Sequence, residues 1–179
     1  MKPEIEINKN FNLSKIKFDL SRQINMFAGS VIQDHKKRLQ HGQGVDEKKM
    51  KQLSPSTIHG KRHNNLSKPR IPLYGEGKML NVYSKERATK SKPINIIIPP
   101  NSRKEVASYH QFGTGPYTIK AKNSPVLGPL FNSKGQKYFS KKVNHPGLPK
   151  REWFGITKKQ EIKGLKLINK AIDRIIRNA

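Results

Sequence analysis

Apolar residues recur at helical spacing near both ends of the chain. Toward the N-terminus they lie three and four residues apart, the period of one helix face. Asp19 or Ser21 can cap this helix, and Gly42 is a natural stop. The apolar positions are Leu20, Ile24, Phe27 and Val31, with Ile32 and Leu39 alongside. The pattern predicts an amphipathic helix that ends in basic residues.

The C-terminal part predicts a second long helix. Thr157 and Gln160 have the spacing of a capping box, in which each side chain bonds the backbone N–H of the other residue. The helix is expected to extend to about Arg177. Its apolar stripe consists of Ile162, Leu165, Ile168, Ile172 and Ile175.

The middle of the chain alternates as strands do. Four strands are predicted, near Met79, over Lys92–Ile98, over 117–122 and over 136–143, and the isoleucine-rich second strand is expected to be central. Two short helices are also predicted, one before the strands and one between the second and third. Ser54 and Pro55 open one that ends near His63, and Ser102 caps another that Gly113 closes. The fold class predicted is α+β, with an antiparallel sheet of about four strands packed by an N-terminal and a C-terminal helix and with a short middle helix.

Four ranges organise the chain. Residues 1–18 are an N-terminal arm or edge strand, since Glu and Ile alternate from Glu4. Residues 19–179 form a single domain. Within it, 43–72 is a long polar excursion, and 123–135 is a loop too long for a tight hairpin and expected to project.

Charge is the strongest compositional signal. Lys and Arg number 37 against 12 Asp and Glu, a formal charge of +25, which favours binding to polyanions without sequence preference. Without cysteine, disulfides, thiolate metal sites and cysteine nucleophiles are excluded. No apolar stretch approaches the length of a membrane span, and MKPEIEINKN lacks the apolar core of a secretory signal. We therefore expect a soluble protein with an anionic neighbour and no membrane.

The segment from Tyr109 to Ile156 combines rigid turns with short strand-like runs. Val106 to Arg151 contains no Asp or Glu, so this part lacks the carboxylates that most hydrolytic chemistry needs. The order of its motifs resembles the tail-completion or head-tail joining proteins of tailed phages, often labelled virion morphogenesis proteins. The resemblance covers roughly 43–179. It rests on Leu53-Ser-Pro-Ser-Thr before Lys61, Gly77 to Leu80, Tyr109-His-Gln-Phe-Gly-Thr-Gly115, His145-Pro-Gly-Leu-Pro-Lys-Arg151 and Trp153-Phe-Gly-Ile156. Glu152 departs from the family, which usually has Pro after the Arg, so the next turn is expected to be less rigid.

The resemblance implies a structural, non-enzymatic subunit without a cofactor. Such a protein forms a ring, expected to be sixfold, between a portal-proximal connector protein and a tail terminator, tail tube or other tail protein, around the channel through which DNA leaves. The location implied is the head-tail junction of the virion, with assembly in the host cytoplasm. The residues expected to form interfaces or fix the fold are Tyr109, His110, Phe112, Gly113, Gly115, His145, Pro146, Gly147, Pro149, Arg151, Trp153 and Phe154. The residues expected to face the DNA channel or acidic partners are Lys120, Lys122, Lys134, Lys137, Lys141 and Lys142.

Catalytic and metal-binding interpretations fit these residues less well. His110 has no carboxylate near it in sequence, so packing at a helix end is favoured over a base or ligand. His59 and His63 have zinc spacing but no third ligand. Gly113-Thr-Gly115 is interpreted as a turn rather than a phosphate cradle. Arg151 either pairs with an acid, stacks on the indole of Trp153 or reaches across an interface, and an interface or fold-fixing role is favoured.

Two other function classes compete with a virion subunit. A basic nucleic-acid-binding protein of ribosomal or nucleoid type fits the charge and the scattered aromatic residues, although no recognisable binding motif is present. An enzyme such as a nuclease ranks last, because Asp46 and Glu47 are the only adjacent acids and lie in the polar excursion.

Overall fold

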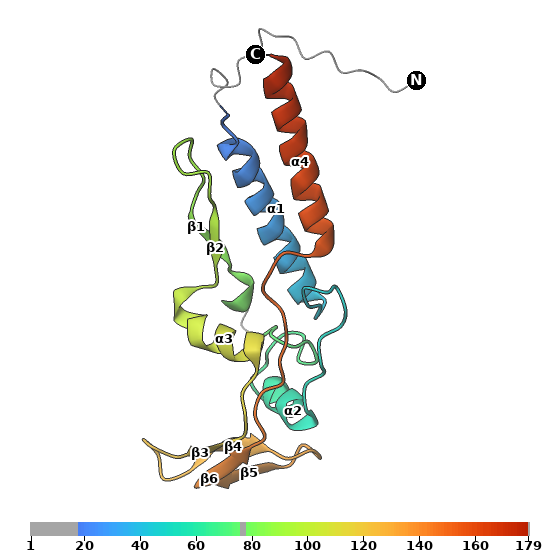
Figure 1. The fold of residues 1–179 in the computed structure, drawn as a ribbon. Coiled ribbons are helices and arrows are strands. Elements are labelled where there is room, and N and C mark those ends of the chain that lie inside the picture. The colour runs from blue at the N-terminus through green and yellow to red at the C-terminus, as the bar shows by residue number, and fades with distance from the viewer. Residues whose placement is uncertain (1–17, 76–77, 179) are drawn as a thin grey trace.

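The structure is a computed structural model that describes residues 18–75 and 78–178. The molecule is long and narrow, with two helices side by side toward one end and a β-ribbon at the other (Figure 1). Its helices are α1 (Ser21–Gln40), α2 (Pro55–His63), α3 (Lys104–Phe112) and α4 (Lys158–Arg177), with 3-10 turns η2 (Lys78–Leu80) and η3 (Asn101–Arg103). Its strands are β1 (Tyr83–Glu86), β2 (Ile96–Ile98), β3 (Tyr117–Lys120), β4 (Leu127–Phe131), β5 (Lys137–Ser140) and β6 (Lys142–His145).

Helices α1 and α4 form the antiparallel pair at one end (Figure 1). The predicted capping box is present: the Thr157 N–H donates to Gln160 Oε1 at 2.9 Å and the Gln160 N–H donates to Thr157 Oγ1 at 3.2 Å. The packed face of α4 differs from the predicted stripe. Gly164 is buried against the Phe27 ring of α1, while Leu165 is 55% exposed. Small residues let the helices approach closely, which turns part of the isoleucine stripe toward solvent.

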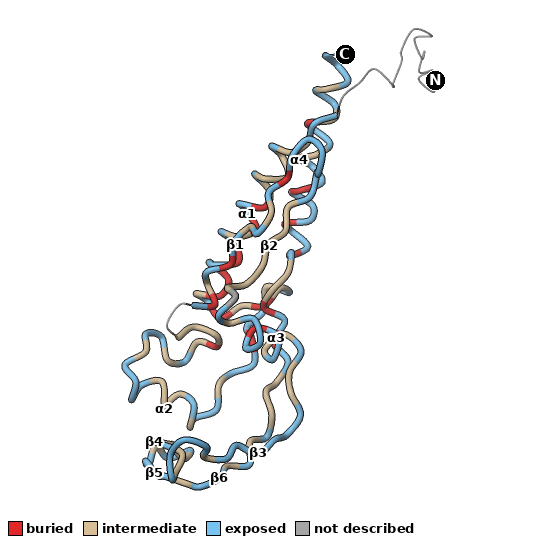
Figure 2. The backbone as a smooth tube through the Cα atoms, turned by 90° about the vertical axis from the view of Figure 1, so that its left-hand side faces the viewer, coloured by how far each residue is buried: buried red, intermediate tan, exposed pale blue. Residues whose placement is uncertain are grey.

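The hydrophobic core lies where the C-terminal end of α1 meets the middle of the chain, as the buried segments in Figure 2 show. Segments far apart in sequence converge there. Trp153 is 1% exposed, and Ile97 and Phe154 pack against the cluster. The cluster comprises Leu39, Met50, Met79, Val82, Ala107 and Trp153.

The short helices are close to their predicted bounds. Ser54 caps α2 by accepting the Thr57 N–H at 3.3 Å, and Gly113 ends α3. Ser102 does not cap α3; it lies in the preceding turn η3. The strand predicted near Met79 begins later, at Tyr83, because Met79 sits in η2 and is buried in the core.

The strands form three separate antiparallel pairs, β1 with β2, β3 with β6 and β4 with β5. The isoleucine-rich strand β2 is therefore not central, because it pairs only with β1. The predicted strand 136–143 is divided at Lys141, beside which the Ser140 hydroxyl bonds both the N–H and the carbonyl of Lys142. Its two halves take different partners, which produces two ribbons in place of one sheet.

The predicted loop 123–135 contains a strand. Its residues Leu127–Phe131 are β4, which pairs with β5 across an irregular register. Gly128 and Pro129 are turn residues in most contexts, and Pro is tolerated in a strand that has a free edge. The strand also contacts α2, since His63 lies 5.2 Å from the Phe131 ring.

The architecture confirms the α+β class, with helices and small antiparallel sheets. No helix in the ranges 18–75 and 78–178 is long and apolar enough to cross a membrane. The predicted N-terminal arm 1–18 lies outside the described residues except for Phe18. Within 43–72, only α2 and an isolated bridge between Gln43 and Lys49 are regular, apart from the turns.

Candidate functional site

The turns predicted from glycine and proline form one corner, at which the chain leaves α3 and later returns from β6. The Thr114 N–H donates to Leu148 O at 3.0 Å, and the Leu148 N–H donates to Thr114 Oγ1 at 2.9 Å. Gly147 has φ +91°, and a Cβ there would overlap Thr114 O and lie 2.8 Å from Gly115 O. A Cβ at Gly115 would meet nothing within 4 Å. The corner therefore requires glycine at 147 and not at 115.

His145 belongs to the same corner. Its Nδ1 accepts the Gly147 N–H at 3.0 Å, and its ring stacks on Tyr117 with centroids 4.7 Å apart. Pro146 is exposed and Pro149 half-buried on either side of this turn. These contacts of His145 stabilise the base of the β3–β6 ribbon.

Trp153 and Phe154 are held by Gln111, which the sequence did not single out. Gln111 Oε1 accepts the N–H groups of Trp153 at 3.2 Å and Phe154 at 3.1 Å, and Gln111 Nε2 donates to Phe154 O at 3.2 Å. The indole Nε1 donates to Ala107 O at 3.1 Å. An amide side chain inside the Tyr109–Gly115 motif thus joins α3 to the segment before α4.

The basic end of α1 is partly inside the protein rather than on a solvated face. Arg38 is 4% exposed and donates to Asp34 at 3.0 Å, to Gly44 O at 3.0 Å and to Gly155 O at 3.2 Å. His35 is 2% exposed, its ring lies 5.3 Å from the Trp153 ring, and burial lowers its pKa to about 4. The helical spacing of the sequence did not distinguish the buried His35 and Arg38 from the exposed Lys36 and Lys37 between them.

Arg151 is the most unusual charged residue of the site. It is only 6% exposed, yet Nε makes its one side-chain hydrogen bond, to Lys51 O at 3.3 Å. No carboxylate among residues 18–75 and 78–178 pairs with it, and its guanidinium stacks on no ring. Burial lowers the pKa of Arg151. Of the three roles considered, pairing with an acid and stacking on Trp153 are both absent from the described chain.

His110 lies beside Arg151. Its carbonyl accepts the Arg151 N–H at 2.8 Å, and its Nδ1 is buried without a partner. Burial, followed by the Arg151 charge, lowers the pKa of His110 to about 4, so the ring is neutral at pH 7. A neutral ring that meets no carboxylate does not form a catalytic pair here.

A groove of about 1100 Å³ opens in front of these two residues. The extended segment 51–54 and α2 form one wall, and the β3–β6 and β4–β5 ribbons form the other. The lining is mainly apolar, and its charged groups are cationic, with no Asp or Glu among them. A cation that is buried in an apolar, acid-free groove is suited to receive an anionic group from outside.

Two of the predicted interface residues are exposed on α3. Tyr109 is 49% and Phe112 73% exposed, and Val106, three residues before Tyr109, is 37% exposed. The three side chains follow one another at helical spacing of three. They form an uncovered apolar strip that contributes nothing to the core.

The six predicted contact lysines lie on the strands of the β3–β6 and β4–β5 ribbons or in the segments that join them, and all six are exposed. Lys120 and Lys142 are direct cross-strand partners of β3 and β6. Like charges directly opposite in an antiparallel pair repel, and an anion placed between them relieves the repulsion. Large side chains are exposed among them, including Tyr138 at 41% and Phe139 at 56%.

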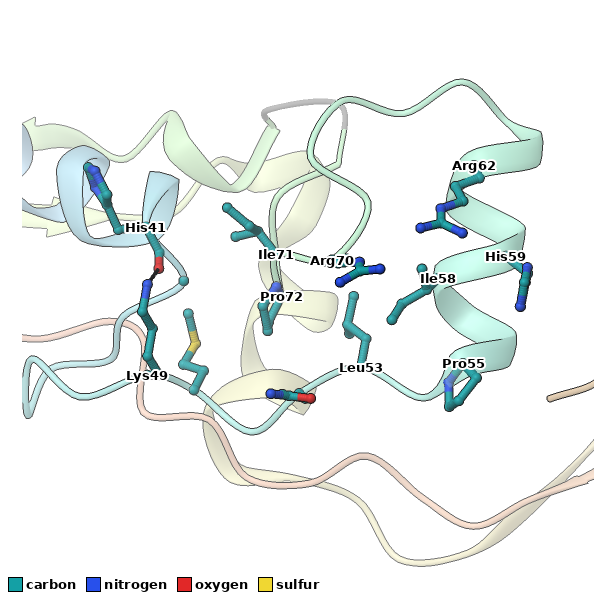
Figure 3. Close-up of a pocket in the computed structure, with 13 residues that line it drawn as sticks. His41, Lys49, Leu53, Pro55, Ile58, His59, Arg62, Arg70, Ile71 and Pro72 are labelled. Carbon is teal, nitrogen blue, oxygen red and sulfur yellow. Dashed lines mark hydrogen bonds between the residues drawn. The ribbon is translucent and has the colours of Figure 1, made fainter. Parts of the chain in front are cut away.

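A second, smaller pocket of about 510 Å³ lies between the end of α1, the segment 49–55 and α2 (Figure 3). Lys49 Nζ closes one side by donating to His41 O at 2.7 Å. Arg62 and Arg70 lie on the opposite side over Ile58, and no described carboxylate pairs with either. This pocket adds to the cationic surface near the ribbon.

The part of the chain that the structure describes holds no cluster of three or more metal-binding side chains. His59 instead packs against Gly135 of the ribbon, and His63 against Phe131. Comparisons with protein-family models, curated proteins and solved structures found no match to this chain.

Proposed function

We propose that the protein is a structural subunit of a tailed-phage virion at the head-tail junction, which assembles as a ring, sixfold by resemblance, around the DNA channel. Its neighbours on this proposal are a connector protein on the head side and a tail protein on the other. The proposal assigns no catalytic residue and no cofactor. The cationic ribbon would contact DNA or acidic partner surfaces.

One observation carries the proposal: the isolated chain buries too little of its surface. Among the described residues, fifteen large apolar side chains are exposed by 37% or more, against ten buried apolar ones. Such a chain is suited to neighbours that complete its packing.

The arrangement of charge supports the same proposal. The cross-strand pair Lys120 and Lys142 lies in a segment without acids, so the ribbon repels itself until an anion is near. A ring that surrounds DNA supplies such an anion along its lumen. The groove beside Arg151 faces the same ribbon and offers a separate place for a protein neighbour.

The experiment that tests the proposal combines assembly and location. Purified protein should form a ring in negative-stain images, bind a connector protein, and be detected by mass spectrometry in mature particles. Its gene is expected between those for a portal or major capsid protein and a tail-tube protein. A chain that stays monomeric at high concentration and is absent from particles would overturn the proposal.

A basic nucleic-acid-binding protein is the second candidate, because Tyr138 and Phe139 are exposed beside the ribbon lysines. Salt-sensitive DNA binding by a stable monomer would favour it. On either proposal, replacing Lys120 and Lys142 by Ala should reduce the slope of log K against log salt for DNA by about two. The matched control replaces Lys163 and Lys166 of α4, which are also exposed, and should leave the slope unchanged. Equal slopes for both variants would show that the ribbon does not bind DNA.

A further inference from the structure

Arg151 lines the groove, and no carboxylate of the described chain pairs with its guanidinium. Its Nε donates to Lys51 O at 3.3 Å, and its other nitrogens make no hydrogen bond within the described residues, so they can bind an anion that enters the groove. The groove of about 1100 Å³ in front of it gives access from outside. Its largely apolar lining, drawn from several strands and the segment 51–54, is suited to a peptide with a carboxylate among apolar side chains.

The lining residues define what such a peptide must present. Ile119, Leu130 and Val143 offer apolar contacts from three different strands. Arg151 and Lys51 offer charged contacts. A strand that alternates acidic and apolar residues meets both, because successive side chains of an extended chain point to opposite sides.

The carboxylates of the described residues are largely engaged elsewhere. Of the 12 acids, Glu4, Glu6 and Glu76 lie outside the described ranges, which leaves nine. Five of these form ion pairs with lysine or arginine. Asp19 and Asp46 each accept a backbone N–H two residues away. Nowhere else in the sequence do acids alternate with apolar residues as they do in Glu4-Ile-Glu-Ile7.

The length of chain before α1 limits whether the Glu4–Ile7 segment can reach the groove of its own chain or must bind that of a second copy. α1 begins at the end of the molecule remote from the ribbon, and its 20 residues are about 30 Å long. The 11 residues from Ile7 to Phe18 span at most about 40 Å when fully extended. Reaching its own groove, which lies beyond the C-terminal end of α1, would require nearly the whole of that length. A second copy has no such limit.

We propose that the groove beside Arg151 binds the Glu4–Ile7 segment of a second copy of this chain. One Glu carboxylate accepts hydrogen bonds from the Arg151 guanidinium, and the isoleucines pack on the apolar wall. The contact would link each subunit to the next. This inference rests on the proposed assembly of copies and names the surfaces that join them.

The absence of cysteine makes a direct test simple. One full-length chain carries Asn8→Cys, another carries Gln52→Cys at the groove, and the two are mixed and oxidised. Gln52 is exposed and lines the groove, while Gln33, exposed on α1, is the control position. We expect the mixed disulfide with Gln52→Cys to form at least about tenfold faster than with Gln33→Cys. Adding Glu4→Gln and Glu6→Gln to the first chain should slow it about tenfold, since a buried charged contact is lost.

The outcomes separate the alternatives. Equal rates at the two positions, or no effect of the Glu→Gln changes, would overturn the inference. A doubly substituted chain, Asn8→Cys with Gln52→Cys, that closes on itself at high dilution would show that a chain fills its own groove. Arg151→Gln should match the Glu→Gln loss, with circular dichroism melting to confirm that this variant is folded. If it is not, the Glu variants, which lie outside the described fold, still decide.

Failure of this contact is distinguishable from failure of the proposed function. Rings that persist with Glu4→Gln and Glu6→Gln, without a cross-link at Gln52→Cys, would refute the segment contact and leave the ring in place. A groove that stays uncross-linked in rings but is protected by a connector or tail protein would assign it to a different partner. A chain absent from particles would refute the virion proposal whatever the cross-link shows.

Discussion

Replacing Trp153 by Ala tests whether this side chain stabilises the fold of the single chain, independently of any interface. The indole is 1% exposed and donates to Ala107 O. An aromatic side chain of this kind buries about 150–250 Å², or about 4–6 kcal/mol at 25 cal/mol per Å², from which the area that Ala keeps must be subtracted. Measured Trp→Ala changes of about 3–5 kcal/mol agree with this range. We therefore expect the free energy of unfolding to fall by about 4 kcal/mol.

Urea denaturation followed by Trp-independent far-UV circular dichroism measures this loss, and thermal melting should show a midpoint roughly 10 °C lower. Phe112→Ala is the matched control, because Phe112 is 73% exposed and should change stability by less than about 0.5 kcal/mol. If Phe112 lies at an interface, its variant assembles poorly while remaining stable. A loss below about 1 kcal/mol for Trp153→Ala would refute the assignment of the core.

Three further predictions concern the same framework. Because burial lowers the pKa of His35 to about 4, the unfolded chain binds more protons between pH 6.5 and 4, so stability present above pH 6.5 is lost toward pH 4. His35→Gln should remove up to about 1.4 kcal/mol per pH unit of that slope in urea titrations at several pH values. Gly147→Ala should destabilise by about 2 kcal/mol or more and Gly115→Ala by little, so equal midpoints would refute the corner geometry. Gln160→Ala should cost about 1 kcal/mol in thermal melts through loss of the capping box, and an unchanged midpoint would count against it.

The structure separates two kinds of residue that the sequence motifs grouped together. Gly147 and Trp153 hold the chain in place, whereas Tyr109 and Phe112 contribute exposed apolar surface. Arg151 belongs to neither kind, since it is buried yet lacks the partner that a fold-fixing charge would have. We therefore expect partners to contact the groove beside Arg151 and the β3–β6 ribbon.

Local rules were enough for much of the secondary structure. The capping box at Thr157 and the Ser54–Pro55 start of α2 depend on residues within one helical turn, so their positions were predictable from the sequence alone. The α+β class followed in the same way from the order of helical and strand-like patterns along the chain.

Strand pairing and burial were decided only by tertiary structure. The break at Lys141 and the strand at 127–131 depend on which segments pair in the β3–β6 and β4–β5 ribbons. Hydrogen bonds between strands do not change the pattern of apolar residues within each strand, so the sequence did not predict these pairings. Burial of Arg38 and Arg151 depends likewise on segments a hundred or more residues away, since Arg38 bonds Gly155 O and Arg151 bonds Lys51 O. A charged side chain appears the same in sequence whether water or the protein surrounds it, so only the folded chain shows which charges lie inside.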